Sequence, residues 1–266
     1  MSIMKKVFAL LAVGIGVFTL SACEGNDEST LVVGLECNYA PFNWTDMDEG
    51  EDIAEAPAYC DGYDVDVARK VADELGRELI IRKVGWDGLI PALTSGTIDV
   101  IIAGMSPTPE RAETVNFTDD YYRSEQVLVL RNDSEYVGAT ELSDFSGATV
   151  IAQKGTLQDD LIDQIENVDH ANPLDDYPSL VEQVKSGTSD ALLAELPVAT
   201  SITYNNESLT IVELEEGFEV EESDVTVAIA LRKEDEALRD QINTILAAID
   251  VATRNQWMEE ALNRQP

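Results

Sequence analysis

The residues best suited to chemistry in this 266-residue chain follow a short apolar run, Val100 to Ala103. A turn of small residues comes next, Gly104-Met105-Ser106-Pro107-Thr108, and Arg111 lies just beyond it. A strand end offers backbone groups, serine offers a hydroxyl, and arginine offers a planar fork of donors that matches a carboxylate. This spacing predicts a carboxylate-binding site.

Residues typical of other chemistries are scarce. The single histidine, His170, lies in a polar stretch, and no spacing of Cys and His indicates a metal site. Gly104-Met105-Ser106 lacks the glycine that a nucleophile elbow needs after its serine, and no phosphate-binding loop is present. We therefore expect no cofactor and no bound metal, and a binding protein rather than an enzyme.

The start of the chain indicates export. Two lysines precede an apolar run, Val7 to Leu20, which is too short to cross a bilayer. The run ends in Leu20-Ser21-Ala22-Cys23, which is similar to a bacterial lipobox. This implies a signal peptide over residues 1–22, lipid on Cys23 and a polar tether over residues 23–30. We expect an extracytoplasmic protein that its lipid anchors to the cell membrane.

Export gives meaning to the count of three cysteines. If Cys23 carries lipid, Cys37 and Cys60 remain as an even pair in an oxidising compartment. They flank a polar, acidic stretch, so we expect a disulfide that closes this loop. Two free thiols are the alternative, and they are less common outside the cell.

The formal net charge is −35. Such a chain does not bind nucleic acid or an anionic membrane surface through its charge. The acids cluster at Asp46–Asp52 and at Glu213–Asp224, and the first cluster lacks the ligand spacing of a calcium loop. We interpret both clusters as solvated acidic surface. An acidic proteome and a salty habitat would each explain them.

The chemical residues need a scaffold, and the periodicity of the chain predicts one. Apolar strands and amphipathic helices alternate from Leu31 to Ala103, and a second cycle of the same plan starts near Ser143. We expect an α/β fold of two lobes, each a mostly parallel sheet flanked by helices, around one ligand-binding cleft. The boundaries that we predict are 31–123 for the first part of lobe 1, 124–223 for lobe 2 and 224–266 for the completion of lobe 1.

Several motifs follow one another along nearly the whole mature chain: Asn38-Tyr39-Ala40-Pro41-Phe42, Gly62-Tyr63-Asp64-Val65-Asp66, Trp86 to Leu93, Ser106 to Arg111, Phe117-Thr118-Asp119, Gln153-Lys154-Gly155-Thr156 and Leu231 to Asp235. Together, and in this order, they resemble the motifs of extracytoplasmic solute-binding proteins of polar amino acid ABC transporters, solute-binding protein family 3, with the type II periplasmic binding fold. The resemblance implies capture of an amino acid by hinged closure of a monomer, and delivery to a permease and its ATPase.

The resemblance also implies roles for individual residues. Arg111 matches the arginine that holds the ligand α-carboxylate, and Ser106 matches a hydroxyl that contacts the ligand backbone. Glu195 stands where the family usually has an aspartate for the α-ammonium, so the charge is kept on a longer side chain. The other matched positions offer main-chain groups or complete the carboxylate clamp from lobe 2, with Leu157 able to serve only through its backbone amide: Ala103, Gly104, Thr156 and Leu157.

The resemblance also implies which kind of side chain the amino acid ligand carries. Tyr39 and Trp86 match two aromatics that sandwich it, and Glu36 matches an acid at the far end of a cationic ligand. Aromatic faces and an acid favour lysine, arginine or ornithine. Glutamine or another polar amino acid is the alternative, because an acid at this position also occurs with neutral ligands. A cyclohexadienyl dehydratase-like enzyme is a further alternative, with an acid near Glu195 as general acid.

Overall fold

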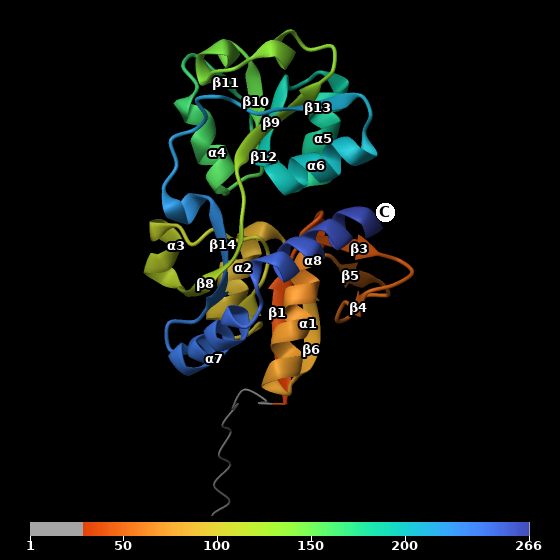
Figure 1. Cartoon of the computed structure of the whole chain (residues 1–266), viewed down its shortest axis with the longest axis vertical. Coiled ribbons are helices and arrows are strands. Elements are labelled where there is room, and N and C mark those ends of the chain that lie inside the picture. Colours follow the sequence, from red (N-terminus) through yellow and green to blue (C-terminus); the bar gives the residue numbers. More distant parts are fainter. Residues whose placement is uncertain (1–28, 266) are drawn as a thin grey trace, which may run out of the picture.

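The computed structural model describes residues 29–265. The predicted signal peptide, the lipid on Cys23 and most of the predicted tether lie outside these residues. Figure 1 shows two lobes, one above the other, each with a sheet and covering helices. The chain passes between them at the end of β8 and again before β14.

Lobe 1 is built on a five-stranded sheet of order β6-β1-β7-β14-β8. Its strands are β1 (Thr30–Leu35), β6 (Glu78–Lys83), β7 (Val100–Ile101), β8 (Asn116–Arg123) and β14 (Thr226–Leu231). Its helices are α1 (Tyr63–Leu75), α2 (Trp86–Thr94), α3 (Pro109–Thr114), α7 (Glu236–Ala247) and α8 (Val251–Arg264). A smaller sheet at its side has the order β2-β3-β5-β4, with β2 (Asn38–Tyr39), β3 (Asn43–Asp46), β4 (Glu51–Asp52) and β5 (Tyr59–Asp61).

Lobe 2 is built on a five-stranded sheet of order β11-β10-β12-β9-β13. Its strands are β9 (Gln126–Arg131), β10 (Thr149–Ile151), β11 (Asp169–His170), β12 (Ala191–Glu195) and β13 (Leu209–Val212). Its helices are α4 (Leu157–Leu161), α5 (Tyr177–Ser186) and α6 (Leu196–Asn205). Short 3-10 turns are η1 (Glu135–Gly138), η2 (Leu142–Phe145), η3 (Ile162–Gln164) and, before β14, η4 (Glu222–Asp224).

Both sheets are mixed, whereas the sequence pattern predicts mostly parallel ones. In lobe 1, β1 runs parallel to β6 and β7, but β14 runs antiparallel to β7 and β8. In lobe 2, β10 runs parallel to β11 and β12, but β9 runs antiparallel to β12 and β13. The cause is the crossing between lobes: β8 leaves lobe 1, β14 returns to it, and the two pair side by side.

Burial follows the predicted periodicity. In α1, Val67 and Val71 are buried, and the helix ends at Gly76, whose left-handed φ of 67° suits glycine. In α2, Leu89 and Leu93 face the core and leave Trp86 half-buried at the first turn. The apolar run after Asp99 is wholly buried, although only its first two residues form β7. The α5 helix begins directly after Asp176, which caps it by accepting a hydrogen bond from the Ser179 amide.

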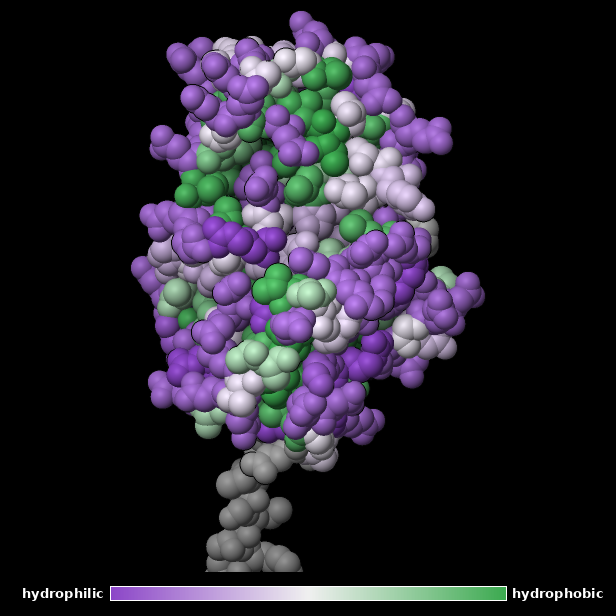
Figure 2. Space-filling view, in the orientation of Figure 1, coloured by the Kyte–Doolittle hydropathy of each residue, from purple (hydrophilic) through white to green (hydrophobic). Residues whose placement is uncertain are grey.

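The face of the molecule in Figure 2 is largely hydrophilic, and its apolar residues gather mainly on lobe 2, with smaller groups on lobe 1. Most residues of the two acidic clusters are exposed or half-buried, as expected for solvated surface. Among the described residues, the large apolar side chains that stand out in solvent are Met47, Val137, Tyr204, Val220 and Val251. No helix within residues 29–265 has both the length and the apolar character needed to cross a membrane.

The structure contains the expected disulfide. Cys37 and Cys60 are bonded with a Cα–Cα distance of 5.7 Å and a sequence separation of 23 residues. The bond ties the segment after β1 to β5, next to the residues that line the cleft between the lobes.

Reduction of this bond is expected to lower the free energy of unfolding by roughly 3 kcal/mol, because a loop of this length restricts the unfolded chain. Urea unfolding with and without a phosphine reductant measures the difference. The Cys37→Ser/Cys60→Ser double variant is the control, since reductant should not shift its midpoint further. An unchanged wild-type midpoint under reductant would show that the bond does not stabilise the fold.

Candidate functional site

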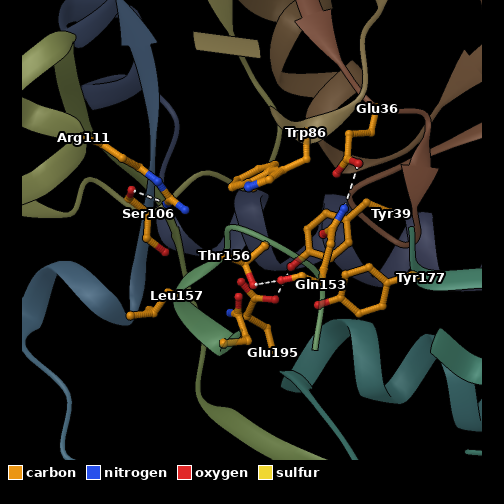
Figure 3. A pocket seen from close by; sticks show the side chains of 12 residues that line it. Glu36, Tyr39, Trp86, Ser106, Arg111, Gln153, Thr156, Leu157, Tyr177 and Glu195 are labelled. Carbon is orange, nitrogen blue, oxygen red and sulfur yellow. Dashed lines mark hydrogen bonds between the residues drawn. The ribbon is translucent and has the colours of Figure 1, made fainter. Parts of the chain in front are cut away.

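The candidate site lies between the lobes, where strand ends of both sheets meet. Its described lining residues are Glu36, Tyr39, Trp86, Gly104, Ser106 and Arg111 from lobe 1, and Gln153, Thr156, Leu157, Gln158, Tyr177 and Glu195 from lobe 2. Figure 3 shows labelled side chains of both lobes around one space, with Arg111 and Ser106 at one side and Glu36, Tyr39 and Tyr177 at the other. The cavity between them has a volume of about 10 Å³, roughly the space for one water. In this closed form the two lobes therefore contact each other directly.

Arg111 lies on α3, directly after the small-residue turn. Its Nη1 donates to the Ser106 carbonyl at 2.9 Å, and its Nη2 approaches the Gly155 carbonyl of lobe 2 at 3.5 Å. The guanidinium carbon lies 5.0 Å from the centre of the Trp86 ring. Burial lowers the pKa of Arg111, and the negative charge of Glu195 opposes that effect. The guanidinium therefore sits at the cleft with donors that a carboxylate can recruit.

Buried side chains of lobe 1 fix the conformation of the turn before Arg111. Gly104 has a φ of 61°, and a Cβ there would lie 2.7 Å from the Tyr39 ring, so the close approach requires glycine. The Gly104 amide donates to the Tyr121 hydroxyl at 3.0 Å, which in turn donates to the Asp64 carboxylate at 2.6 Å. The Gly104 amide is thus engaged within the protein. Ala103 is fully buried behind the turn and is not among the lining residues.

Asp64 anchors that network. It is fully buried on α1 and also accepts from the Asn43 side chain at 2.8 Å. Burial raises the pKa of Asp64 to about 6, although these hydrogen bonds favour the carboxylate. The Gly62 to Asp66 motif of the sequence therefore acts through positioning, because it places a carboxylate under the turn that carries Ser106.

On lobe 2, Thr156 caps the start of α4. Its hydroxyl donates to the Gln153 carbonyl at 2.7 Å and accepts from the Asp159 amide at 3.4 Å. Leu157 is the first helical residue, and its side chain is half-buried. Backbone amides in a first helical turn lack partners within the helix, so Thr156 and Leu157 can offer amides to the cleft.

Glu195 ends β12 and is 3% exposed. It accepts a short hydrogen bond from the Tyr39 hydroxyl, which comes from the opposite lobe. Burial raises the pKa of Glu195, while Tyr39, Gln158 and the charge of Arg111 work in the other direction. The carboxyl is thus enclosed in the cleft, with a neutral hydroxyl as its direct partner across the lobes.

Glu36 lies at the other end of the site, just after β1, and is 4% exposed. The Gln153 side-chain amide donates to it at 2.9 Å and also donates to the Asp175 carbonyl at 3.0 Å. Burial raises the pKa of Glu36 to about 7, and the nearby charges of Asp176 and Asp87 add to the rise. No cationic side chain among the described residues forms an ion pair with it.

Aromatic rings enclose the space between the two acids. Tyr39 stacks on Phe42 at 5.2 Å, and the Tyr177 ring of lobe 2 lies 4.9 Å from Tyr39 at an angle of 44°. Trp86 donates its indole N–H to the Gly155 carbonyl at 2.9 Å, so it contacts lobe 2 at the mouth of the cleft. In the closed form the ring nearest to Tyr39 across the lobes is Tyr177.

Sequence reasoning did not single out Gln153, Gln158 and Tyr177 as site residues. Gln153 opens the Gln153-Lys154-Gly155-Thr156 motif, so its place before the helix start was an available signal. Tyr177 had no such signal, because only the docking of α5 against β2 brings it to the cleft. Within residues 29–265, no group of three or more His, Cys, Asp and Glu side chains is placed to hold a metal ion.

Comparisons with known proteins agree with this architecture. The arginine-binding extracellular protein ArtP of Bacillus subtilis is 30% identical over 261 residues, covering 93% of each chain. A Streptococcus pneumoniae amino acid ABC transporter substrate-binding protein, solved with L-arginine, is 27% identical with a TM-score of 0.78 and covers 89% of this chain and 95% of its own. The ancestral amino acid-binding protein AncCDT-1, described as a precursor of cyclohexadienyl dehydratase, is 26% identical with a TM-score of 0.73, over 88% and 95% of the two chains.

The model of the bacterial extracellular solute-binding proteins, family 3, matches residues 31–260. This range contains both five-stranded sheets, except for the first residue of β1, and every lining residue of the cleft. From the extent of this match, together with the relative that is 30% identical over nearly the whole chain, the protein belongs to the bacterial extracellular solute-binding proteins of family 3.

Proposed function

We propose that this protein captures a basic L-amino acid, with arginine as the first candidate, and delivers it to the permease of an ABC importer. Charge balance in the cleft is the observation that carries the proposal. The ionisable lining residues are two acids, Glu36 and Glu195, and one base, Arg111, besides tyrosines. When both acids are ionised, a ligand with one net positive charge neutralises this set, whereas a neutral amino acid leaves a buried carboxylate unpaired or requires Glu36 to stay protonated.

The proposed pose assigns one partner to each charge of the ligand. Arg111 and the Ser106 hydroxyl, with the Thr156 and Leu157 amides, hold the α-carboxylate. Glu195 pairs with the α-ammonium in place of the Tyr39 hydroxyl. Glu36 receives the side-chain cation, which then lies among the rings of Tyr39, Tyr177 and Trp86.

Lobe closure would produce the affinity. The ligand joins groups of lobe 1 to groups of lobe 2, so it binds the closed form better and shifts the equilibrium toward it. We propose that the lobes comprise residues 31–123 with 224–266, and residues 124–223, and that they rotate about the crossings near Arg123–Gln126 and Glu221–Thr226. The protein would act as a monomer at the outer face of the cell membrane, held by lipid on Cys23.

A thermal-shift screen of the amino acids tests the ligand class. Arginine, lysine or ornithine at a hundred times its dissociation constant adds about 2.7 kcal/mol of stability. For a chain of this size the expected rise in Tm is roughly 5–10 °C. Glutamine at the same concentration is the matched comparison, with little or no rise. A larger rise with glutamine would reverse the ligand assignment, and no rise with any amino acid would refute the receptor role.

The rival function is an enzymatic one, a dehydratase acting on cyclohexadienyl acids, with Glu195 as general acid. The similarity to AncCDT-1 and the raised pKa of Glu195 are the observations in its favour. Incubation with prephenate and arogenate, followed by spectroscopic detection of aromatic product, discriminates the two. We expect no turnover above that of a Glu195→Gln variant.

Tyr177 supplies a prediction about the ligand side chain. Tyr177→Ala is expected to weaken arginine binding by roughly 5–30-fold, because a desolvated cation–aromatic contact is worth about 1–2 kcal/mol. Tyr177→Phe keeps the ring and should stay near wild type. Tyr204→Ala removes an exposed tyrosine of the same lobe and serves as control. Isothermal titration calorimetry measures the arginine affinity of each variant. Equal affinities for Tyr177→Ala and wild type would show that Tyr177 does not contact the ligand side chain.

A further inference from the structure

The last described residue of the chain contacts the opposite lobe and is not itself among the lining residues of the candidate site. Gln265 follows α8 of lobe 1, and its side-chain carbonyl accepts a short hydrogen bond from the Ser201 hydroxyl on α6 of lobe 2. The two residues are 9% and 4% exposed, so the contact is buried. In Figure 1 the C-terminal end lies beside α6, apart from the segments that cross between the lobes.

Lobe 1 holds its half of this contact firmly. Arg264, the preceding residue, donates to Asp61 at 2.8 and 3.0 Å and to Asp66 at 2.6 Å. Its guanidinium also lies 5.8 Å from the centre of the Trp44 ring. The backbone N–H of Gln265 donates to the Ala261 carbonyl at 3.2 Å. Gln265 is therefore presented to lobe 2 by an anchored helix end, which reduces the entropy lost when the contact forms.

The lobe 2 half belongs to the helix next to the ligand site. The α6 helix starts at Leu196, directly after Glu195, and Ser201 lies less than two turns along it. Ser201 also lines a groove at the seam of the lobes, with Tyr177, Val198 and Ile202 of lobe 2 and Asn38 and Ala40 of lobe 1. A contact that holds Ser201 in place therefore also restrains the helix that follows Glu195. It restrains the groove between the lobes beside Tyr177 as well.

We infer that Gln265 is a positioning residue for ligand capture, which acts through Ser201 to hold α6 against the end of α8 in the closed form. Because its partner lies on the other lobe, opening of the cleft breaks this hydrogen bond. The bond therefore raises the closed population and slows ligand release without touching the ligand.

The net free energy of the contact between Gln265 and Ser201 is small, so the contact can break when the cleft opens. The Gln265 side-chain nitrogen is buried without a hydrogen-bond partner in the described structure. Opening gives this nitrogen access to water, which offsets part of the loss of the Ser201 hydrogen bond. The contact therefore biases the equilibrium modestly and leaves the lobes free to open.

The test uses the full chain with Gln265→Ala, Ser201→Ala and the double variant. The closed fraction without ligand is measured by small-angle X-ray scattering, and the release rate of arginine by stopped flow. Each single variant should lower the closed population and speed release roughly fivefold. The double variant should do no more than either single one, because both remove the same contact. Asn263→Ala, at an exposed position of α8, is the matched control and should change neither quantity.

Two results would overturn the inference. The first is a closed fraction and a release rate that match wild type in Gln265→Ala. The second is a lower Tm in that variant with an unchanged closed fraction, which would assign Gln265 a purely structural role. The scattering measurement needs no ligand, so it tests the contact between lobes even if the proposed ligand class is wrong.

Discussion

Replacing Arg111 with alanine is expected to weaken amino acid binding by about a thousandfold. The variant leaves the ligand α-carboxylate in a closed cleft without its cation, and removal of one partner of a buried ion pair costs about 3–5 kcal/mol. Within the protein the Arg111 side chain makes one hydrogen bond to the Ser106 carbonyl, a long one to Gly155 and a contact with the Trp86 ring. The fold should therefore survive the change.

Calorimetric titration and circular dichroism separate loss of binding from loss of fold. Arg111→Lys keeps the charge but not the planar fork, so we expect an intermediate loss. Arg239→Ala is the matched control, because Arg239 lies on α7 and pairs with its neighbour Asp240 far from the lining residues. Arginine affinity within threefold of wild type in Arg111→Ala would exclude Arg111 from the carboxylate clamp.

Glu36→Gln is expected to weaken binding of basic amino acids by about a hundredfold and to leave glutamine affinity nearly unchanged. The side chain at position 36 would then be a neutral amide beside the amide of Gln153, and two neutral amides cannot compensate a buried ligand cation. The ratio of arginine to glutamine affinity is the decisive measurement, since a general disturbance of the cleft would weaken both ligands. Equal losses for the two ligands would refute the assignment of Glu36 to the side-chain cation.

The same residue predicts a pH dependence. In the ligand-free closed form burial raises the pKa of Glu36 to about 7, so a sizeable fraction is protonated at neutral pH. A ligand cation beside it favours the carboxylate and lowers its pKa, so the complex binds fewer protons than the free protein. Arginine affinity should therefore rise as pH increases toward about 7, by up to about tenfold per pH unit, and level off above. Glu36→Gln should flatten the profile near neutral pH, and titrations in buffers of different ionisation enthalpy should show proton release only in wild type.

Local patterns accounted for much of the fold. The spacing of Val67 and Val71, the glycine after α1 and the apolar run of β7 each have a local physical cause, so they could be read without tertiary information. No local pattern in the sequence indicates that β14 and β9 run antiparallel to their neighbours. An apolar strand has the same pattern whether its neighbour runs parallel or antiparallel, and only the two crossings between the lobes determine which.

For the site, local sequence patterns were enough to indicate the chemical types: a guanidinium after a small-residue turn, acids at the ends of two strands and a threonine before a helix. Tertiary structure decided which of them meet. Tyr177 reaches Tyr39, and Gln153 reaches Glu36, only because lobe closure brings segments more than a hundred residues apart into contact. The same closure buries Glu36 and Glu195 together with a single Arg111. The small-residue turn and its arginine, a carboxylate site when taken as sequence, thereby become one end of a cleft with two buried acids, and this excess of acids supports the proposed cationic ligand, because electrostatic cost depends on burial and burial depends on the whole fold.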